Sequence, residues 1–324
     1  MSLLEMKNIS KEFPGVKALD NVSLTVRRGT VHALMGENGA GKSTLMKILI
    51  GAHRADSGTI RFNGEDLEPS TLTVHQALGK GISMIFQEPM TSLNPVFRIG
   101  AQLDEVIALH DGEGKTPEDI KARSIHLLEM AGIANSEGVY KMYPHELSGG
   151  MRQRVMIAIA LACEPKLLIA DEPTTALDVT IQAQILELMQ DLRKKLGMSI
   201  IMITHDLGVV ASMCEKIAVM YAGHIVEYGT TDEIFYQPGH EYTKGLINSI
   251  PKLNTAEHER LVPIEGTPVD LLNPPAGCPF APRCKNCMKI CLSKMPPRTE
   301  LSDTHYTYCW LQQKAAFEKG EKAE

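Results

Sequence analysis

The sequence has no hydrophobic run long enough to cross a membrane. Its longest unbroken apolar stretch is VMIAIALAC, residues 155–163, whereas a bilayer-spanning helix needs about 20 apolar residues. The first ten residues, MSLLEMKNIS, contain an early acid and no apolar core, which is not the pattern of a secretory signal. We therefore expect a soluble chain that is not directed to an oxidising compartment.

An excess of basic residues is also lacking. The 33 lysines and arginines are outnumbered by 39 acidic residues, which gives a formal net charge of −6. Proteins that bind nucleic acid through its phosphates carry a basic excess, so we expect no nucleic-acid partner. The 324 residues, 44% of them hydrophobic, are enough for one large domain with a core and a smaller appendage.

Cysteine and proline are scarce in the first three quarters of the chain and concentrated at its end. Nine of the 18 prolines and five of the seven cysteines lie between Pro251 and Glu324. This change in composition predicts a main domain over residues 1–250 and a loop-rich, Cys- and Pro-rich C-terminal module over residues 251–324.

Before that point, apolar strands alternate with helical patterns, which is typical of an α/β fold with a buried, largely parallel sheet. Thr116 and Pro117 are expected to start a helix as its cap and first residue, and Gly197 to end a long helix. The segments ISMIF and LLIAD read as strands, and KIAVMYAG with HIVEYG as a final strand pair. The expected strands lie at 22–26, 31–35, 58–64, 82–86, 167–171, 199–204, 216–223 and 224–229, and the expected helices at 42–50, within about 100–163, and at 179–197.

The stretch GENGAGKST, Gly36–Thr44, fits the phosphate-loop pattern G-x-x-x-x-G-K-[ST] between an expected strand and an expected helix. Its glycines let backbone amides surround phosphate oxygens, and the helix N-terminus adds partial positive charge. Lys42 can reach the β- and γ-phosphates, and the Ser43 hydroxyl can bind Mg²⁺. The alternative is a glycine-rich turn without a ligand, which the strand–loop–helix context disfavours.

A second part of the site is expected where the strand LLIADE ends in two acids. Ligands of open parallel sheets bind at the carboxyl ends of the strands. Asp171 is expected to hold Mg²⁺ there, directly or through water, and Glu172 to polarise the attacking water. His205 ends a further strand, IMITH, from which its imidazole could meet the γ-phosphate.

The stretch LSGGMRQRV places Ser148 and two glycines directly before an apolar helical run, which predicts a second anion-binding helix N-terminus. A plain capped helix would explain the serine but not both glycines. One nucleotide can use both phosphate receptors only if they face each other. Two chains packed head to tail meet this condition, each chain completing the other's site.

With these motifs in place, residues 3–250 resemble the ATP-binding subunits of ATP-binding cassette (ABC) transporters. The resemblance implies a P-loop ATPase with an antiparallel β part and a helical subdomain at about 90–163. It implies catalytic roles for Glu172 and His205, a D-loop with Asp178, and Mg²⁺ bound by Ser43, Gln87 and Asp171. Leu147, Ser148, Gly149 and Gly150 would contact the ATP of the opposite subunit. The implied nucleotide-binding residues are Phe13, which would stack on adenine, Gly36, Glu37, Asn38, Gly39, Ala40, Gly41, Lys42, Ser43, Thr44, Gln87 and Asp171.

The substrate class rests on further resemblances. QEPMTSLNPVFRIG, residues 87–100, and the tail EGTPVDLLNPPAGCPFAPRC resemble the dipeptide and oligopeptide importers, whereas residues 8–88 resemble sugar-importer ATPases. We therefore expect an ATP hydrolase that drives peptide import, with a sugar importer, a chimera of the two, or a non-transport ABC ATPase as alternatives. The expected partners are a second ATPase subunit (a sister or an identical chain), two membrane permeases and, indirectly, a substrate-binding protein. The expected location is the cytoplasmic face of the membrane.

A disulfide framework is disfavoured for the C-terminal cysteines, because thiols stay reduced in the cytoplasm. We expect them to bind metal instead, on the resemblance that follows. The spacing of Cys278, Cys284, Cys291 and Cys309 resembles that of the peptide subfamily, some of whose members are thought to bind a [4Fe–4S] cluster. Four thiolates suit such a cluster and also suit tetrahedral zinc. Cys287 is an extra thiol whose Cys-x₂-Cys spacing with Cys284 keeps zinc open as an alternative. Inert buried thiols are the third possibility. Two earlier cysteines, Cys163 and Cys214, lie in apolar helical surroundings and are expected to be core residues.

Overall fold

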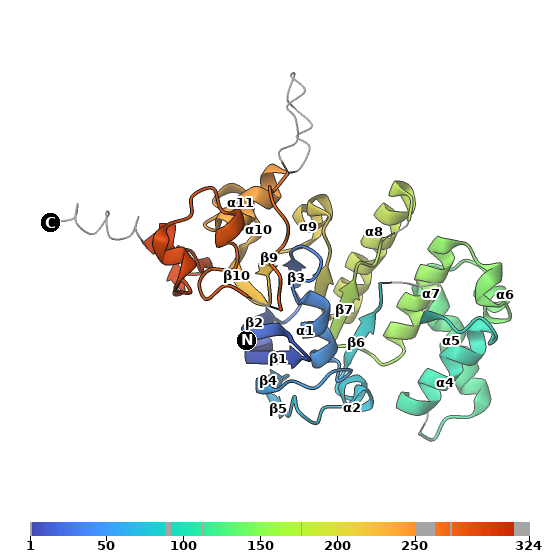
Figure 1. The fold of residues 1–324 in the computed structure, drawn as a ribbon. Helices are drawn as coiled ribbons and strands as arrows, with labels where there is room; N and C mark the ends of the chain where they lie inside the picture. Colours follow the sequence, from blue (N-terminus) through green and yellow to red (C-terminus); the bar gives the residue numbers. More distant parts are fainter. Residues whose placement is uncertain are drawn as a thin grey trace, which may run out of the picture.

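The computed structural model describes residues 2–87, 92–111, 113–175, 177–249, 263–272 and 274–313. Two sheets and several groups of helices make up this part of the chain (Figure 1). Within it, no helix is both long and apolar enough to span a bilayer. The strands are β1 (Ser2–Phe13), β2 (Val16–Arg27), β3 (Val31–Met35), β4 (Ser57–Phe62), β5 (Glu65–Leu67), β6 (Ile82–Ile85), β7 (Leu167–Asp171), β8 (Ser199–Ile203), β9 (Lys216–Tyr221), β10 (His224–Thr230), β11 (Thr299–Glu300) and β12 (Tyr306–Thr307). The helices are α1 (Lys42–Leu49), α2 (Val74–Gly79), α4 (Ile99–Asp111), α5 (Pro117–Met130), α6 (Ser136–Tyr140), α7 (Gly149–Leu161), α8 (Val179–Leu196), α9 (Leu207–Met213), α10 (Thr231–Tyr236) and α11 (Glu241–Asn248), with the short 3₁₀ helices η1 (Pro144–Glu146), η2 (Ala281–Arg283) and η3 (Lys289–Leu292).

The larger sheet has eight strands in the order β11-β12-β10-β9-β3-β8-β7-β6. Five strands run parallel to one another: β9, β3, β8, β7 and β6. Three more, β10, β12 and β11, are added antiparallel at the β9 edge. Every residue of β3, β7 and β8 is buried, as expected for strands covered by helices on both faces. The predicted α/β fold with a mostly parallel core sheet is confirmed.

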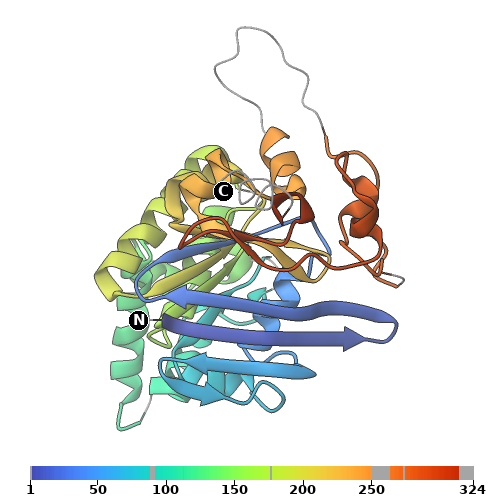
Figure 2. The ribbon, with the colours of Figure 1, turned by 90° about the vertical axis from the view of Figure 1, so that its left-hand side faces the viewer.

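A smaller antiparallel sheet, with the order β2-β1-β4-β5, lies beside the main one and is seen along its long strands in Figure 2. Its apolar side chains form a second core together with α1 and one face of the central strands, including Leu45, Ile48, Leu49, Ile60 and Phe62. The phosphate-loop helix α1 is therefore held between the two sheets.

The helices α4 to α7 form a group at the opposite side of the molecule from the C-terminal module (Figure 1). As predicted, Thr116 caps α5 and Pro117 is its first residue: the Thr116 side chain accepts from the amide of Asp119, whose carboxylate accepts from the amide of Thr116. Gly197 ends α8 with a left-handed φ of 64°.

The C-terminal residues extend the main sheet and join its core. Strand β12 pairs with β10, so the predicted final strand pair of β9 and β10 is not the last: β11 and β12 follow it. These strands have two residues each, which is too short to produce an alternating pattern in the sequence. Cys278, Phe280, Ala281 and Cys291 are buried in the same core as the central sheet.

Candidate nucleotide site

The phosphate loop joins β3 to α1, as predicted. Gly36, Gly39 and Gly41 have φ values of 150°, 79° and 99°. A Cβ atom at Gly36 would lie 2.1 Å from the carbonyl oxygen of Met220, and one at Gly41 would lie 2.7 Å from that of Ala18. Glycine is therefore required at both places by the close approach of other backbone segments as well as by conformation.

The ammonium group of Lys42 is held inside the loop. Its Nζ donates to the carbonyl oxygens of Gly36 at 2.8 Å and Glu37 at 2.9 Å. Burial lowers the pKa of Lys42, and the nearby charges of Glu172 and Asp171 oppose this shift. Gly41 has no side chain to cap α1, so amides at the start of the helix are available to an anionic ligand.

The acid pair lies at the carboxyl end of β7, next to the loop. Asp171 is buried and accepts a hydrogen bond from the hydroxyl of Ser43. Burial raises the pKa of Asp171; the Ser43 hydrogen bond opposes this rise, the charge of Glu172 adds to it, and Lys42 opposes it. Oxygen ligands of this kind are those that Mg²⁺ prefers, so Ser43 and Asp171 fit a magnesium ion.

Glu172 is the centre of a group of polar side chains. Gln87 Nε2 donates to its Oε2 at 2.8 Å, Thr175 Oγ1 donates to the same oxygen at 3.0 Å, and His205 Nδ1 lies 3.1 Å from Oε1. Burial alone would raise the pKa of Glu172, but the hydrogen bonds from His205 and Thr175 lower it on balance. The carboxylate is therefore ionised at neutral pH and able to accept a proton.

The backbone at Glu172 is unusual. Its φ is 47°, in the left-handed region that residues other than glycine rarely adopt, and its amide donates to the carbonyl oxygen of Ile203 at 2.9 Å. Such conformations cost about 1–3 kcal/mol and concentrate at functional sites. Here the turn directs the carboxylate of Glu172 toward Gln87 and His205.

Phe13, the expected adenine-stacking residue, ends β1 and is partly exposed. His53 contacts its ring edge-on, with ring centroids 5.5 Å apart, and the ammonium group of Lys11 lies 5.4 Å from the ring centroid. The aromatic face has cationic and imidazole neighbours that the sequence did not indicate. Its role with adenine stays a prediction.

The LSGG motif starts α7. Leu147 is buried, while Ser148 is exposed and caps the helix by accepting from the amide of Met151 at 3.3 Å. A Cβ atom at Gly150 would lie 2.8 Å from a methyl carbon of Ile181, so the second glycine lets α7 pack closely against the start of α8. Helix α7 belongs to the helical group, whereas α1 lies against the central sheet (Figure 1).

The expected D-loop residue Asp178 caps α8. Its carboxylate accepts from the amide of Ile181 at 3.0 Å, which explains the residue type by helix capping. The D-loop role stays a prediction.

Four of the C-terminal cysteines line one small cavity: Cys278, Cys284, Cys291 and Cys309. Its volume is about 20 Å³, roughly the room that one water molecule needs. Burial raises the pKa of Cys278 to about 12 and that of Cys284 to about 11. Cys287 is exposed and does not line this cavity.

Among the described residues, no group of three or more His, Cys, Asp or Glu side chains is placed to hold a single metal ion. The four cysteines match a cluster by type and by facing one cavity, but they do not surround one ion. The expectation for Cys214 is confirmed, since it is buried; Cys163 is only partly buried.

Sequence reasoning missed residues that hold the phosphate loop from outside. Arg283 binds the carboxylate of Glu37, and the amide of Glu37 donates to Tyr242 Oη at 2.7 Å. Neither residue belongs to a motif that would have pointed to the loop. Thr175, by contrast, lies within the TTALD stretch, and like Gln87 it donates a hydrogen bond to Oε2 of Glu172.

A family described as "ABC transporter" matches residues 19–175, and one described as "Oligopeptide/dipeptide transporter, C-terminal region" matches residues 226–291. The chain is 52% identical to the oligopeptide transport ATP-binding protein OppD of Bacillus subtilis, with 95% of this chain and 88% of that protein covered. It is 48% identical to the dipeptide transport ATP-binding protein DppD of Lactococcus lactis, with 95% of this chain and 90% of that protein covered.

These alignments cover nearly the whole chain, so they include most of residues 8–88, which resemble sugar importers. Among solved structures, cbiO1 from Clostridium perfringens, part of the ABC transporter complex cbiONQ, matches with a TM-score of 0.63 and 32% identity over 73% of this chain and 91% of that one. The dimeric ATP-binding cassette MJ0796 bound to ADP and Pi matches with a TM-score of 0.61 and 27% identity over 70% of this chain and 98% of that one.

Proposed function

This chain belongs to the ABC transporter family, among the ATP-binding subunits of oligopeptide and dipeptide transporters, and from that premise we propose how its residues work. It is an ATP hydrolase whose reaction energises the import of dipeptides or oligopeptides. The observation that carries the residue-level proposal is the meeting of Lys42, Ser43, Asp171 and Glu172 at one end of the central sheet.

In the proposed reaction, Lys42 exchanges its two carbonyl partners for the β- and γ-phosphates. Ser43 and Asp171 would hold Mg²⁺, and Gln87, which follows β6, would contribute its amide. When bound, Mg²⁺ neutralises charge on the phosphate oxygens. The oxygen of the attacking water bonds to the γ-phosphorus as the bond to the leaving ADP breaks, and Glu172 accepts a proton from that water. His205, beside Glu172, orients the carboxylate and contacts the γ-phosphate.

The nucleotide is proposed to lie between two chains. Ser148 and the glycines after it form an anion-binding helix start that belongs to the helical group, while the phosphate loop belongs to the sheet. A head-to-tail pair would place each signature motif on the partner's ATP. The dimeric cassette MJ0796 supports such pairing by likeness of fold. The partner in the cell is a second ATPase subunit, either a sister or an identical chain.

The dimer is proposed to dock on two permease subunits at the cytoplasmic face of the membrane, with a substrate-binding protein delivering peptide from outside. The test is ATP hydrolysis in proteoliposomes that contain this chain, peptide-transporter permeases and their binding protein. We expect added oligopeptide to stimulate phosphate release, and Lys42→Ala to abolish it. Stimulation by sugar through sugar-importer permeases, with none by peptide, would overturn the assignment.

The cysteine cavity is proposed to hold a [4Fe–4S] cluster that stabilises the C-terminal module. Four thiols around one cavity support this, since such clusters are held by four cysteines. The described side chains are not placed to hold a single metal ion, so binding would rearrange this cavity. Cys287 is exposed and lies outside this group, so the zinc alternative rests on the same four thiols as the cluster.

Protein purified without oxygen tests the cluster. We expect a brown protein with about four irons per chain. Cys278→Ser and Cys291→Ser should lose this iron, while Cys287→Ser, whose side chain lies outside the cavity, should keep it. Colourless wild-type protein that contains zinc or no metal would contradict the proposal.

A further inference from the structure

The phosphate loop is bound by a residue of the C-terminal module. Arg283 and Glu37, 246 positions apart, form a two-pronged ion pair in which Nη1 lies 2.7 Å from Oε2 and Nη2 lies 3.1 Å from Oε1. The side chains are 6% and 25% exposed. Paired, planar contacts of this kind fix the orientation of both partners, which a single lysine contact does not.

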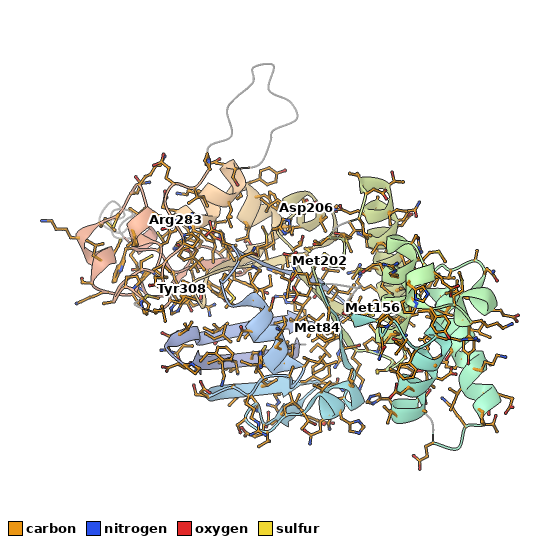
Figure 3. The ribbon with its side chains drawn as sticks, turned by 45° about the vertical axis from the view of Figure 1, so that its right-hand side comes forward. Met84, Met156, Met202, Asp206, Arg283 and Tyr308 are labelled. Atoms are coloured by element: carbon orange, nitrogen blue, oxygen red, sulfur yellow. The ribbon has the colours of Figure 1, made fainter. Side chains whose placement is uncertain are left out.

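The guanidinium group of Arg283 is itself held on all sides. Its Nε donates to the carbonyl oxygen of Glu265 at 3.1 Å, and Nη2 donates to that of Ile264 at 3.3 Å. The group lies 6.0 Å from the ring centroids of both Tyr221 and Phe280. Figure 3 shows Arg283 in the C-terminal part of the molecule, on the side opposite Met156 of α7. The ion pair therefore joins the C-terminal module to the phosphate loop through a side chain that has several further contacts.

Glu37 connects this ion pair to Lys42 of the phosphate loop. Its carboxylate binds Arg283, its amide donates to Tyr242 Oη at 2.7 Å, and its carbonyl oxygen accepts from Lys42 Nζ at 2.9 Å. A displacement of Arg283 would therefore act on the same peptide unit that holds Lys42.

Arg283 is also tied to the cysteine cavity. It ends η2, the short turn that runs between Cys278 and Cys284. The amide of Ala281 donates to the Cys278 carbonyl at 2.9 Å, and the amide of Cys284 donates to the Ala281 carbonyl at 3.2 Å. Phe280 of this turn lines the cavity and packs against Tyr221 and Tyr242, with ring centroids 5.4 Å apart in both cases.

We propose that Arg283 is a positioning residue for ATP, which couples the cysteine-lined turn to the phosphate loop through Glu37. The arrangement of the cysteine cavity thereby sets the affinity of the site for nucleotide. The inference rests on the proposed nucleotide site and adds to it a means by which the C-terminal module acts on that site.

The first test separates ATP affinity from turnover. We expect Arg283→Met and Glu37→Gln each to weaken the binding of Mg²⁺-ATP by about tenfold, a typical effect of breaking a coupled pair. The KM for ATP should rise with little change in kcat. The double variant should bind no more weakly than either single variant, and Arg283→Lys should recover part of the affinity.

Arg298→Met is the matched control, because Arg298 belongs to the same module but pairs with Glu300 at the surface, with both side chains more than half exposed. It should bind ATP like the wild type. Wild-type affinity in both Arg283→Met and Glu37→Gln would overturn the inference. Where Arg283→Met fails to fold, Glu37→Gln alone decides, since it removes the pair from the loop side. If the wild type does not bind ATP, or if its ATP binding does not depend on Lys42, the proposed function itself is refuted.

A second test addresses the coupling to the cavity. Cys284→Ala changes the residue next to Arg283, and we expect it to weaken ATP binding, measured with purified protein and without hydrolysis. In the Arg283→Met background the same change should have no further effect, because the connection is already broken. An equal loss of affinity in both backgrounds would show that the cysteines act by another route and would overturn the coupling.

Discussion

Glu172 combines a strained backbone with a carboxylate held by three neighbours, and this combination supports its proposed role in proton transfer. Its pKa is lowered by His205 and Thr175 against the effect of burial, so it is ionised at the pH of the cell. Glutamine has the same shape and can keep contacts with Gln87 and Thr175, but it cannot accept a proton.

We therefore expect Glu172→Gln to reduce ATP turnover by about 10²- to 10⁴-fold, the usual contribution of a general base, while ATP binding is retained. Phosphate release and equilibrium binding measure the two effects separately. Thr175→Val, which removes one hydrogen bond to Glu172 and leaves the carboxylate, should reduce turnover far less. Turnover of Glu172→Gln within a few-fold of the wild type would exclude this residue as the base.

For single residues, the sequence predicted which ones belong to the site but not all of the side chains that they contact. The phosphate loop follows from a local pattern, because its glycines and Lys42 act through backbone geometry within nine residues. The pair of Glu37 and Arg283 joins segments 246 positions apart and has no periodic or local pattern. Only the packing of the C-terminal module on the sheet brings these two side chains together.

At the scale of elements, α10 is attached to the C-terminal module through one carboxylate. Glu233 accepts from the amide and hydroxyl of Thr230 at 2.7 and 2.8 Å, and from the hydroxyls of Ser302 at 2.5 Å and Thr304 at 2.8 Å. Burial opposes ionisation, but the hydrogen bonds led by that of Ser302 lower the pKa of Glu233 to about 2. The contact therefore depends on the charged form of the carboxylate.

Because this pKa is lowered on folding, the unfolded chain binds a proton at Glu233 between about pH 4.5 and pH 2, where the native chain does not. The stability from Glu233 is complete above pH 4.5 and is lost as the pH falls toward 2. The free energy of unfolding of the wild type should thus fall more steeply than that of Glu233→Gln between pH 5 and 3. Asp232→Asn, at an exposed carboxylate in the same turn, should follow the wild type. Parallel curves for wild type and Glu233→Gln would contradict this account.

The elements differ in how well the sequence predicts them. The strands β3, β7 and β8 are continuous apolar runs, and α5 and α8 carry their own start or stop residues, so local physics indicates them. The strands β11 and β12 have two residues each and exist because the edge of β10 offers free backbone groups. They form only because the C-terminal part of the chain folds back against β10, and no short stretch of sequence determines that it does.

For the whole molecule, the two proposed phosphate receptors of one chain lie on different parts of the fold. The phosphate loop lies between the two sheets, and the LSGG motif starts α7 in the helical group (Figure 1). The presence of two receptors follows from the sequence, since each is a local pattern of glycines before a helix. Their proposed pairing across two chains cannot be read from either pattern, because it would arise only in the assembly.

The head-to-tail arrangement predicts complementation between two inactive chains. Lys42→Ala disables the phosphate loop of its own chain, and Ser148→Arg places a bulky cation at the exposed start of α7. In a mixed dimer, one composite site carries both defects, while the other combines an intact phosphate loop with an intact signature motif. We therefore expect neither variant alone to hydrolyse ATP. In an equal mixture about half of the dimers are mixed and each has one intact site of two, so the activity should reach up to about a quarter of that of the wild type and rise with protein concentration. Phosphate release over a concentration series measures this, with each variant alone and with wild type as references. A mixture that stays inactive at concentrations where the wild type is active would show that the two receptors do not complete each other's sites in this way.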